Sequence, residues 1–537
     1  MRIKSTAIIF LVLLVGVSAV LAGGCGSGKK ALGSGHIRYA LSAEPESIDP
    51  RMSTSLSAST VETQLFEGLT TLDDKNRPIA AAAEKWEVSP DGRKYTFTLR
   101  NGLKWSNGDP VTAHDFEYAW KSGLDPELAS PNAYMLYCLK NGEAFATKKT
   151  DVTQVGVKAK DDRTLEVVLE RPTAYFLSLA AFHAYFPVHK KTVAANSKWA
   201  NQPQTLIGNG PFKLTAWVKS SRMELAKNEH YWDAAKVKSS KLELYLLDNS
   251  STALSMFESG QLDMGDSIPS SEVPRLVKEG KVKIYPFLGT AYVSFHVAKA
   301  PFDNPKVRRA FSLAIDRTAI TEKLLRGGQT PALSFVPPGI ADAGPNEDFR
   351  DKGGALLIDN DVATARRLLA EAGFPEGKGF PNVTFLYNTS ESNKVIAEAL
   401  QEMWKKNLGV QVAVANQEWK VYWDVLDRHD FQMARETWTG DYPDPLTFLD
   451  LFVSGGSNNA PDYRNPAYDK LIAEAQQGLD QNQRMQWLHA AEKIIIDEAV
   501  VAPVFFMTNP VMIHAHVKGV LRSILGVPYL KEAYLVP

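Results

Sequence analysis

The sequence predicts an α/β protein. Residues 383–414 contain a strand at 383–387, a helix at 394–407 and a strand at 410–414, and this order implies a parallel strand pair with a crossover helix. An apolar strand at 502–508 comes late in the chain, after a long α/β stretch. With 537 residues, 44% hydrophobic and 23% charged, it is long enough for two or three domains and a large core.

Alternating apolar and polar residues predict strands through the first half of the chain. The turn Ser89-Pro90-Asp91-Gly92 precedes one of them, and Thr112 or His114 lies near the start of a helix. In chain order, we expect strands at 36–43, 94–99, 164–169, 211–218, 222–227, 241–247, 282–286 and 291–296, and helices at 61–70, 115–122 and 250–259.

Helices dominate the second half. Gly327-Gly328 ends one helix and Gly373 ends another, as glycine after a helix commonly does. We expect helices at 306–315, 317–326, 362–372, 394–407, 421–427, 469–478 and 483–497, and strands at 383–387, 410–414, 431–436 and 502–508.

The N-terminus has the pattern of a secretory signal peptide. Arg2 and Lys4 precede an uncharged apolar stretch at 7–21, which is shorter than the about 20 residues of a membrane-spanning helix. The run Leu21-Ala22-Gly23-Gly24-Cys25 resembles the bacterial lipobox, in which the cysteine receives a diacylglycerol and becomes the first mature residue. We therefore expect residues 1–24 to be removed and Cys25 to be lipidated. The alternative is an ordinary signal peptide cut near Ala22.

Residues 25–36 would then form the lipidated cysteine and a flexible tether of roughly 18 Å. Loss of Arg2 and Lys4 changes the net charge from −1 to −3, so neither nucleic acid nor a polybasic membrane contact is expected. Cys138 is the only other cysteine. If Cys25 is acylated, Cys138 has no disulfide partner, and we expect it to be a small buried hydrophobic residue.

No catalytic motif is present. The sequence contains no HExxH, GxSxG or CxxC. Residues 23–30 nearly match a phosphate-binding loop, but Lys30 stands where Ser or Thr is needed and no strand precedes it. His514 and His516 could face one side of a strand and bind a metal, but no third ligand is apparent. We therefore expect neither an enzyme nor a metal or other cofactor.

Residues 82–116 carry a recognisable motif. The stretch AAEKWEVSPDGRKYTFTLRNGLKWSNGDPVTAHDF resembles the signature of the extracellular solute-binding proteins of peptide ABC transporters, family 5. Further stretches resemble the same family, so that the likeness covers nearly the whole mature chain; they are 208–217, 230–232, 259–264, 307–320, 365–374, 407–419 and 438–445. The last two are most similar to its oligopeptide- and dipeptide-binding branches.

The resemblance implies a type II periplasmic-binding-protein fold. Two large lobes would be joined by two crossing strands, would close over a ligand in the cleft between them, and would carry a third lobe inserted in the first. We name these the first lobe (37–66, 191–288 and 506–537), the inserted lobe (67–190) and the second lobe (289–505).

The resemblance also implies a site for the terminal amine of a peptide. Asp441 matches the aspartate that holds this amine in the family, and a carboxylate in a closed cleft forms a charge-assisted hydrogen bond with it. Without the resemblance, the sequence favours a solvated turn aspartate at this position, which is how we interpret Asp444. We expect backbone and packing contacts to the ligand from its neighbours Trp438, Thr439, Gly440 and Tyr442, with lobe packing as the alternative for Trp438.

Other candidates face the opposite end of the ligand. Arg435 matches an arginine near the ligand's carboxyl end, with a surface arginine as the alternative. Asn393 stands where oligopeptide-binding relatives carry a histidine, and this departure weakens any inference about peptide length. Arg326 could take the place of that histidine in binding a carboxylate. Thr54 and Tyr292 are candidates to line the cleft.

We therefore expect an exported, lipid-anchored monomer in the periplasm or at the cell surface that binds oligopeptides and delivers them to an ABC permease. One alternative keeps the fold but changes the ligand to a dipeptide, cell-wall peptide, glutathione, nickel chelate, haem or sugar. Another is a peptide-sensing lipoprotein without a role in uptake, and a third is an exported hydrolase. Gly26 is not the aspartate that would retain a lipoprotein at an inner membrane.

Overall fold

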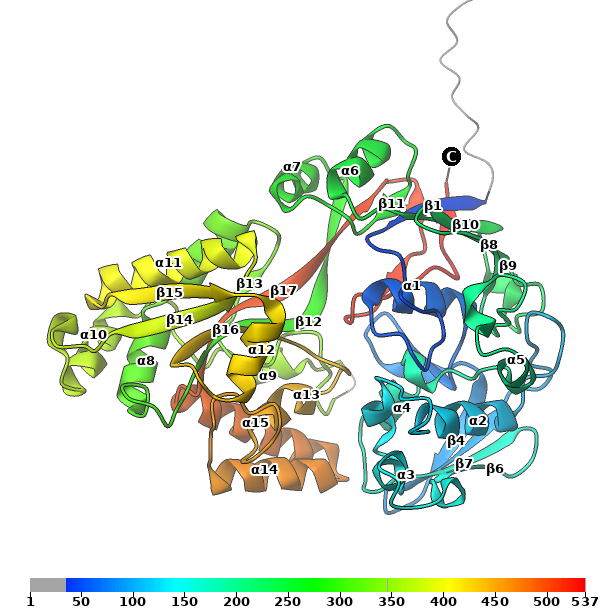
Figure 1. Ribbon diagram of the computed structural model, residues 1–537, viewed down its shortest axis with the longest axis horizontal. Helices are drawn as coiled ribbons and strands as arrows, with labels where there is room; N and C mark the ends of the chain where they lie inside the picture. The colour runs from blue at the N-terminus through cyan, green and yellow to red at the C-terminus, as the bar shows by residue number, and fades with distance from the viewer. Residues whose placement is uncertain (1–34, 345, 537) are drawn as a thin grey trace, which may run out of the picture.

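The computed structural model describes residues 35–344 and 346–536, so the predicted signal peptide, Cys25 and most of the tether lie outside the described residues. Two bodies lie side by side, with β12 (Val282–Phe295) and β17 (Val501–Ile513) running between them (Figure 1). The predicted α/β class is confirmed. Among the described residues, no helix is both long and apolar enough to span a membrane.

One mixed sheet of eleven strands extends through both bodies in the described part of the chain. β14 and β15 pair in parallel with α11 between them, which confirms the predicted crossover unit. In spatial order the sheet comprises β15 (Val412–Gln417), β14 (Val383–Asn388), β16 (Met433–Thr439), β12, β17, β11 (Met264–Gly265), β1 (His36–Leu41), β10 (Lys241–Leu246), β9 (Arg222–Lys227) and β8 (Phe212–Val218), with β13 (Thr330–Pro331) beside β17.

The two lobes are joined where β12 and β17 change register. Pro286 pairs with Thr508 and Thr290 pairs with Phe506, so residues 287–289 face a single residue of β17. Such a bulge bends a strand and increases its local twist. The antiparallel pair therefore continues from one lobe into the other with a bend between them.

The second lobe has its own hydrophobic core, which includes Phe311, Trp404 and Phe448. Its helices surround the β14–β15–β16 part of the sheet, with α11 beside β15 and with α14 and α15 packed together below (Figure 1). They are α8 (Pro305–Leu313), α9 (Phe349–Gly353), α10 (Val362–Glu371), α11 (Glu391–Leu408), α12 (Trp419–Asp427), α13 (Leu446–Leu449), α14 (Pro466–Gln477) and α15 (Gln481–Asp497).

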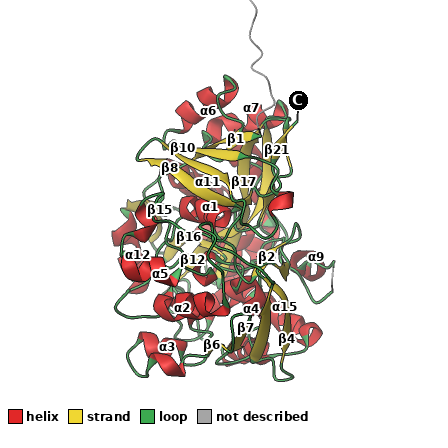
Figure 2. Cartoon of the chain, turned by 90° about the vertical axis from the view of Figure 1, so that its right-hand side faces the viewer, coloured by secondary structure: helices red, strands yellow, loops and turns green. Residues whose placement is uncertain are grey.

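The inserted lobe contains a separate sheet in the order β4-β5-β7-β6, which lies at the opposite end of this body from β1, β8 and β10 (Figure 2). The strands of this lobe are β2 (Thr70–Leu72), β3 (Pro78–Ala80), β4 (Ala83–Val88), β5 (Lys94–Leu99), β6 (Val157–Ala159) and β7 (Thr164–Val168). The helices of the first and inserted lobes are α1 (Leu56–Leu65), α2 (Ala113–Gly123), α3 (Gly142–Ala146), α4 (Phe176–Leu179), α5 (Lys190–Ala195), α6 (Ser250–Glu258) and α7 (Val273–Lys278). The C-terminal segment adds β18 (Val517–Lys518), β19 (Leu521–Arg522), β20 (Pro528–Tyr529) and β21 (Tyr534–Leu535).

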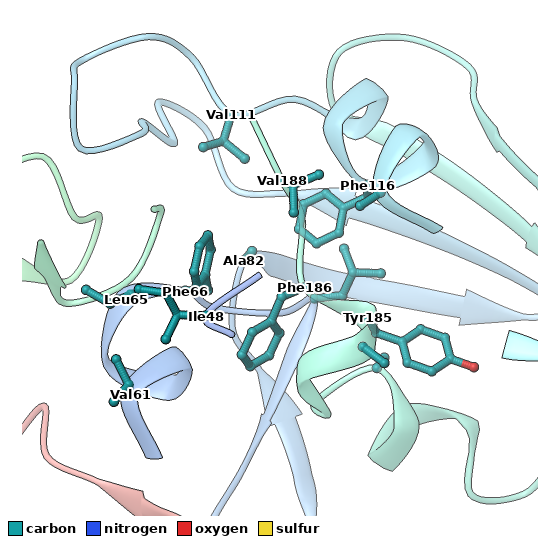
Figure 3. Close-up of a cluster of buried hydrophobic side chains, with 14 of the residues drawn as sticks. Ile48, Val61, Leu65, Phe66, Ala82, Val111, Phe116, Tyr185, Phe186 and Val188 are labelled. Atoms are coloured by element: carbon teal, nitrogen blue, oxygen red, sulfur yellow. The ribbon is translucent and has the colours of Figure 1, made fainter. Parts of the chain in front are cut away.

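The first and inserted lobes share one continuous core. Val61 and Phe66 of the first lobe belong to the same buried cluster as Phe116 and Phe186 of the inserted lobe (Figure 3). Because apolar burial is the main stabilising contribution, we expect these two lobes to unfold together. The lobe boundaries themselves stay predictions.

Several element boundaries differ from those predicted. The two strands expected at 282–286 and 291–296 form the single strand β12, and residues 317–326 contain a π-helix at Ala319–Leu325. α1 begins at Leu56, because Ser55 caps it by accepting a hydrogen bond from the Ala58 N–H. β4 was not predicted. Buried and exposed residues do not alternate regularly along it, as expected for a strand at the edge of a sheet.

Candidate functional site

Asp441 lies in a loop that follows β16 and is held by β12, which we call the hinge strand because it runs from one lobe into the other. The ladder between β12 and β16 ends with Gly289 opposite Thr439, and the Gly440 N–H then donates to the Leu288 carbonyl at 2.8 Å. The Asp441 N–H donates to the Thr447 hydroxyl at 3.1 Å. The backbone around Asp441 is therefore fixed, while its side chain remains available.

The Asp441 carboxylate lacks a counter-charge. No described residue forms a hydrogen bond or ion pair with it, and burial raises its pKa to about 6. Asp450 lies in the same electrostatic neighbourhood, where burial and then the charges of Asp441 and Asp444 raise its pKa to about 7. A cation brought to Asp441 would relieve this unfavourable arrangement.

Asp444 is fixed by a buried ion pair. Arg484 of α15 donates to both Asp444 oxygens, at 2.7 and 2.8 Å, and Asp444 also accepts from the Leu446 N–H at 3.0 Å. The last contact fits the predicted turn-forming role. The bidentate pair also ties the loop to α15.

A narrow cavity at Asp441 is lined from both lobes. On one side are Asp441, Tyr442 and Pro443 of the second lobe. On the other side are Ser59 and Thr63 of α1, His183 of the inserted lobe and residues 523–529 of the C-terminal segment. Burial lowers the pKa of His183 to about 4, so this imidazole is neutral at pH 7 and does not act as the missing cation. Asp441 therefore faces an interlobe space that lacks lysine and arginine among its lining residues.

Tyr442 makes a contact between the inserted and second lobes. Its ring stacks on that of Tyr175, with centroids 4.0 Å apart and planes at 2°. Offset or parallel ring contacts of this kind add about 0.5–1.5 kcal/mol beyond area burial. The predicted ligand-contacting residue is thus already engaged by the inserted lobe.

The other predicted neighbours of Asp441 have different surroundings. Thr439 is exposed, and Trp438 is half-buried with no partner for its indole N–H among the described residues. Gly440 is buried, and a Cβ there would lie 2.6 Å from Leu288 Cδ2. Its lack of a side chain therefore lets the loop approach Leu288 of β12.

No hydrogen bond joins the Arg435 and Asn393 side chains in the described residues. Burial lowers the pKa of Arg435, and its Nε has no hydrogen-bond partner in the described chain. The Asn393 amide donates to Asn388 Oδ1 at 2.9 Å within the second lobe, and Asn393 does not line the Asp441 cavity. Of the weaker candidates, the Thr54 N–H donates to Glu46, Arg326 ends the π-helix with φ 54°, and the Tyr292 hydroxyl donates to Glu436.

Two residues near Asp441 were not predicted from the sequence. The Tyr134 side chain is exposed, and its pKa is raised to about 12 by desolvation of the hydroxyl and then by the charge of Asp441. The ring of Tyr175 stacks on that of Tyr442. Tyr134 and Tyr175 lie in the inserted lobe, far from Asp441 in sequence, so no local pattern could have revealed them.

The remaining sequence features behave as structural groups. In the described residues no three His, Cys, Asp or Glu side chains are arranged to hold a metal. His514 and His516 stack with centroids 5.2 Å apart, and their Nε2 atoms face the Phe257 carbonyl and Asp263. Cys138 is half-buried, with its Sγ 3.2 Å from the Tyr185 hydroxyl.

Comparison with known proteins gives extensive matches. Residues 77–460 match the sequence profile of bacterial extracellular solute-binding proteins, family 5 middle. The oligopeptide-binding protein OppA of Bacillus subtilis is 40% identical over 99% of both chains. The murein tripeptide-binding protein MppA in its unliganded open form aligns with TM-score 0.84 at 37% identity, over 94% of this chain and 98% of that chain. Haemophilus influenzae OppA in complex with RPPGFSPFR aligns with TM-score 0.73 at 34% identity, over 94% and 99%.

Proposed function

Because the chain belongs to family 5 of the bacterial extracellular solute-binding proteins, we propose that it binds oligopeptides in its interlobe cleft and delivers them to an ABC permease for import. It has the two-lobed type II fold of these proteins, and it is a binding protein and not an enzyme. Its relatives named as peptide-binding proteins support the choice of ligand class.

The observation that carries the proposal is the unpaired carboxylate of Asp441 in a cavity lined by both lobes. A peptide's terminal amine is largely cationic at neutral pH and would supply the missing charge. The bound peptide would contact both lobes, so it would favour the closed arrangement through its greater affinity for that state. Arg435, whose Nε has no partner among the described residues, is the proposed contact for the carboxyl end.

Calorimetric titration tests the amine contact. A free peptide is expected to bind the wild-type protein, while its N-acetylated form and the Asp441→Asn variant should each lose at least about tenfold in affinity, the loss expected for a charge-assisted hydrogen bond. The exposed Asp74→Asn variant is the matched control and should bind normally. Equal binding of free and acetylated peptide would contradict the role of Asp441.

Membrane attachment through Cys25 is a second part of the proposal. It is supported by the signal-peptide pattern and by the small residues before Cys25. Cells grown with labelled palmitate should label the wild-type protein and not Cys25→Ser, and the variant should move to the soluble fraction. A labelled or membrane-bound variant would show that the anchor lies elsewhere.

A further inference from the structure

The second lobe contains a cavity of about 350 Å³ beside Trp438, separate from the Asp441 cavity. Its walls come from β12, α12 and β16 and from residues 451–460. The volume lies within the usual range for small-ligand sites and leaves room for a long side chain. None of the residues lining the Asp441 cavity lines this one.

Glu436 gives this cavity a buried acidic group. It is 8% exposed, and its Oε2 accepts a hydrogen bond from the Tyr292 hydroxyl at 3.2 Å. Its Oε1 has no hydrogen-bond partner in the described part of the chain. A buried carboxylate oxygen without a partner is costly, so a cation that reached Glu436 through the cavity would relieve that cost.

The remaining charges around the cavity favour a cation. Asp427 at the end of α12 also lines it, is exposed, and forms no ion pair with any described residue, while the lining contains no lysine or arginine. His429 lines the cavity with its Nδ1 3.0 Å from the Ala460 carbonyl. Arg435 is near enough to interact electrostatically with Glu436, but it does not line the cavity.

Aromatic rings complete the walls. Tyr292, Trp423 and Trp438 all line the cavity, and rings of this kind attract ammonium and guanidinium groups. The Trp438 indole N–H and the Thr437 hydroxyl are buried without partners among the described residues. The cavity thus combines carboxylates for a cationic tip with rings that can pack on an aliphatic stem.

We propose that this cavity is a specificity pocket for a cationic peptide side chain, lysine or arginine, with Glu436 as its principal partner and Asp427 at its entrance. The proposal rests on the proposed peptide-binding function. It predicts that the chain prefers basic residues at one position of the ligand, beyond its recognition of the terminal amine.

Calorimetry with short alanine peptides tests the pocket. Each peptide carries one lysine or one norleucine, placed at successive positions, so that a pair differs mainly in charge. At one position lysine should bind about tenfold more tightly than norleucine, as expected for a charge-assisted hydrogen bond. Glu436→Gln should abolish this preference while binding the all-alanine peptide normally, and Asp427→Asn should reduce it in part.

Two outcomes separate failure of the pocket from failure of the function. If the all-alanine peptide binds but lysine and norleucine are equivalent at every position, or if both variants keep the lysine preference, the pocket assignment is wrong. If no peptide binds the wild-type protein, the proposed function itself is contradicted. Normal thermal unfolding of Glu436→Gln and of the exposed-site variant Asp427→Asn ensures that loss of preference is not loss of fold.

Discussion

Asp441 carries its charge at an energetic disadvantage in the ligand-free protein. Its pKa is raised to about 6 by burial, against an ordinary value of 3.8. The folded state therefore binds more protons than the unfolded state between these two values. Stability should rise as the pH falls through about 6 toward 4, and the group destabilises the fold above that window.

Asp441→Asn should therefore stabilise the ligand-free protein at pH 7.5, by about 1–3 kcal/mol, while weakening peptide binding. Urea unfolding with and without peptide measures both effects. The gain should shrink as the pH falls through 6 and vanish below about pH 3, where the wild-type carboxyl is protonated in both states. A variant less stable than wild type at pH 7.5 would show that Asp441 makes stabilising contacts in the free protein.

Peptide affinity should depend on pH in the opposite direction to the stability of the ligand-free protein, and should fall as the pH falls. The amine contact requires ionised Asp441, so affinity for an all-alanine peptide should be about tenfold lower at pH 5 than at pH 7. Asp450, whose pKa is raised to about 7, shares this neighbourhood and should broaden the transition. Asp441→Asn serves as the control and should lose most of the pH dependence; a wild-type affinity that is flat from pH 7 to pH 5 would argue against the contact.

At the scale of elements, the loop between β16 and α13 is held by Arg484 of α15. The Arg484–Asp444 pair is nearly fully buried, so Arg484→Met would leave Asp444 as an uncompensated buried charge beside Asp441. We expect a loss of about 3–5 kcal/mol in unfolding free energy, measured by urea denaturation. The double variant with Asp444→Asn should recover much of that loss, and no recovery would mean that Arg484 acts through packing alone.

The elements predicted best from the sequence were those with strong local patterns. β5 has the predicted bounds, and α11 with its two parallel strands follows from helical and strand periodicity. β12 was predicted as two strands because Phe287-Leu288-Gly289 interrupts the pattern. In the fold these residues form a bulge whose cause lies in the pairing with β17, more than 200 residues away in sequence.

The same distinction applies to the site. Asp441 could be proposed as a site residue because its motif resembles that of a known family. The contacts of the residues next to it could not be predicted in this way. Gly440 packs on Leu288 of the hinge strand, and Tyr442 stacks on Tyr175 of the inserted lobe. Both contacts join segments distant in sequence, so only tertiary structure reveals them.

At the scale of the whole molecule, the lobes are joined mainly by a bent strand pair. The alignment is closer to the unliganded open form of MppA, with TM-score 0.84, than to the peptide complex of H. influenzae OppA, with 0.73. The present arrangement of the lobes is therefore more similar to that open form, with Tyr175 and Tyr442 in contact between the inserted and second lobes. A bend at residues 286–290 of β12 provides the site at which they could close.

Closure should be visible in solution. Adding saturating peptide should reduce the radius of gyration in small-angle X-ray scattering, because the two lobes approach each other around the ligand. Asp441→Asn should need a correspondingly higher peptide concentration for the same change. A radius that stays constant at saturation would contradict a hinge mechanism, whatever the affinity.

The most direct test of peptide recognition by Asp441 is a crystal structure of the protein purified without refolding and crystallised with bound peptide. We predict closed lobes around an extended peptide whose terminal amine lies at hydrogen-bond distance from the Asp441 carboxylate. A peptide bound with its amine elsewhere, or a retained ligand without an amine at this position, would contradict it.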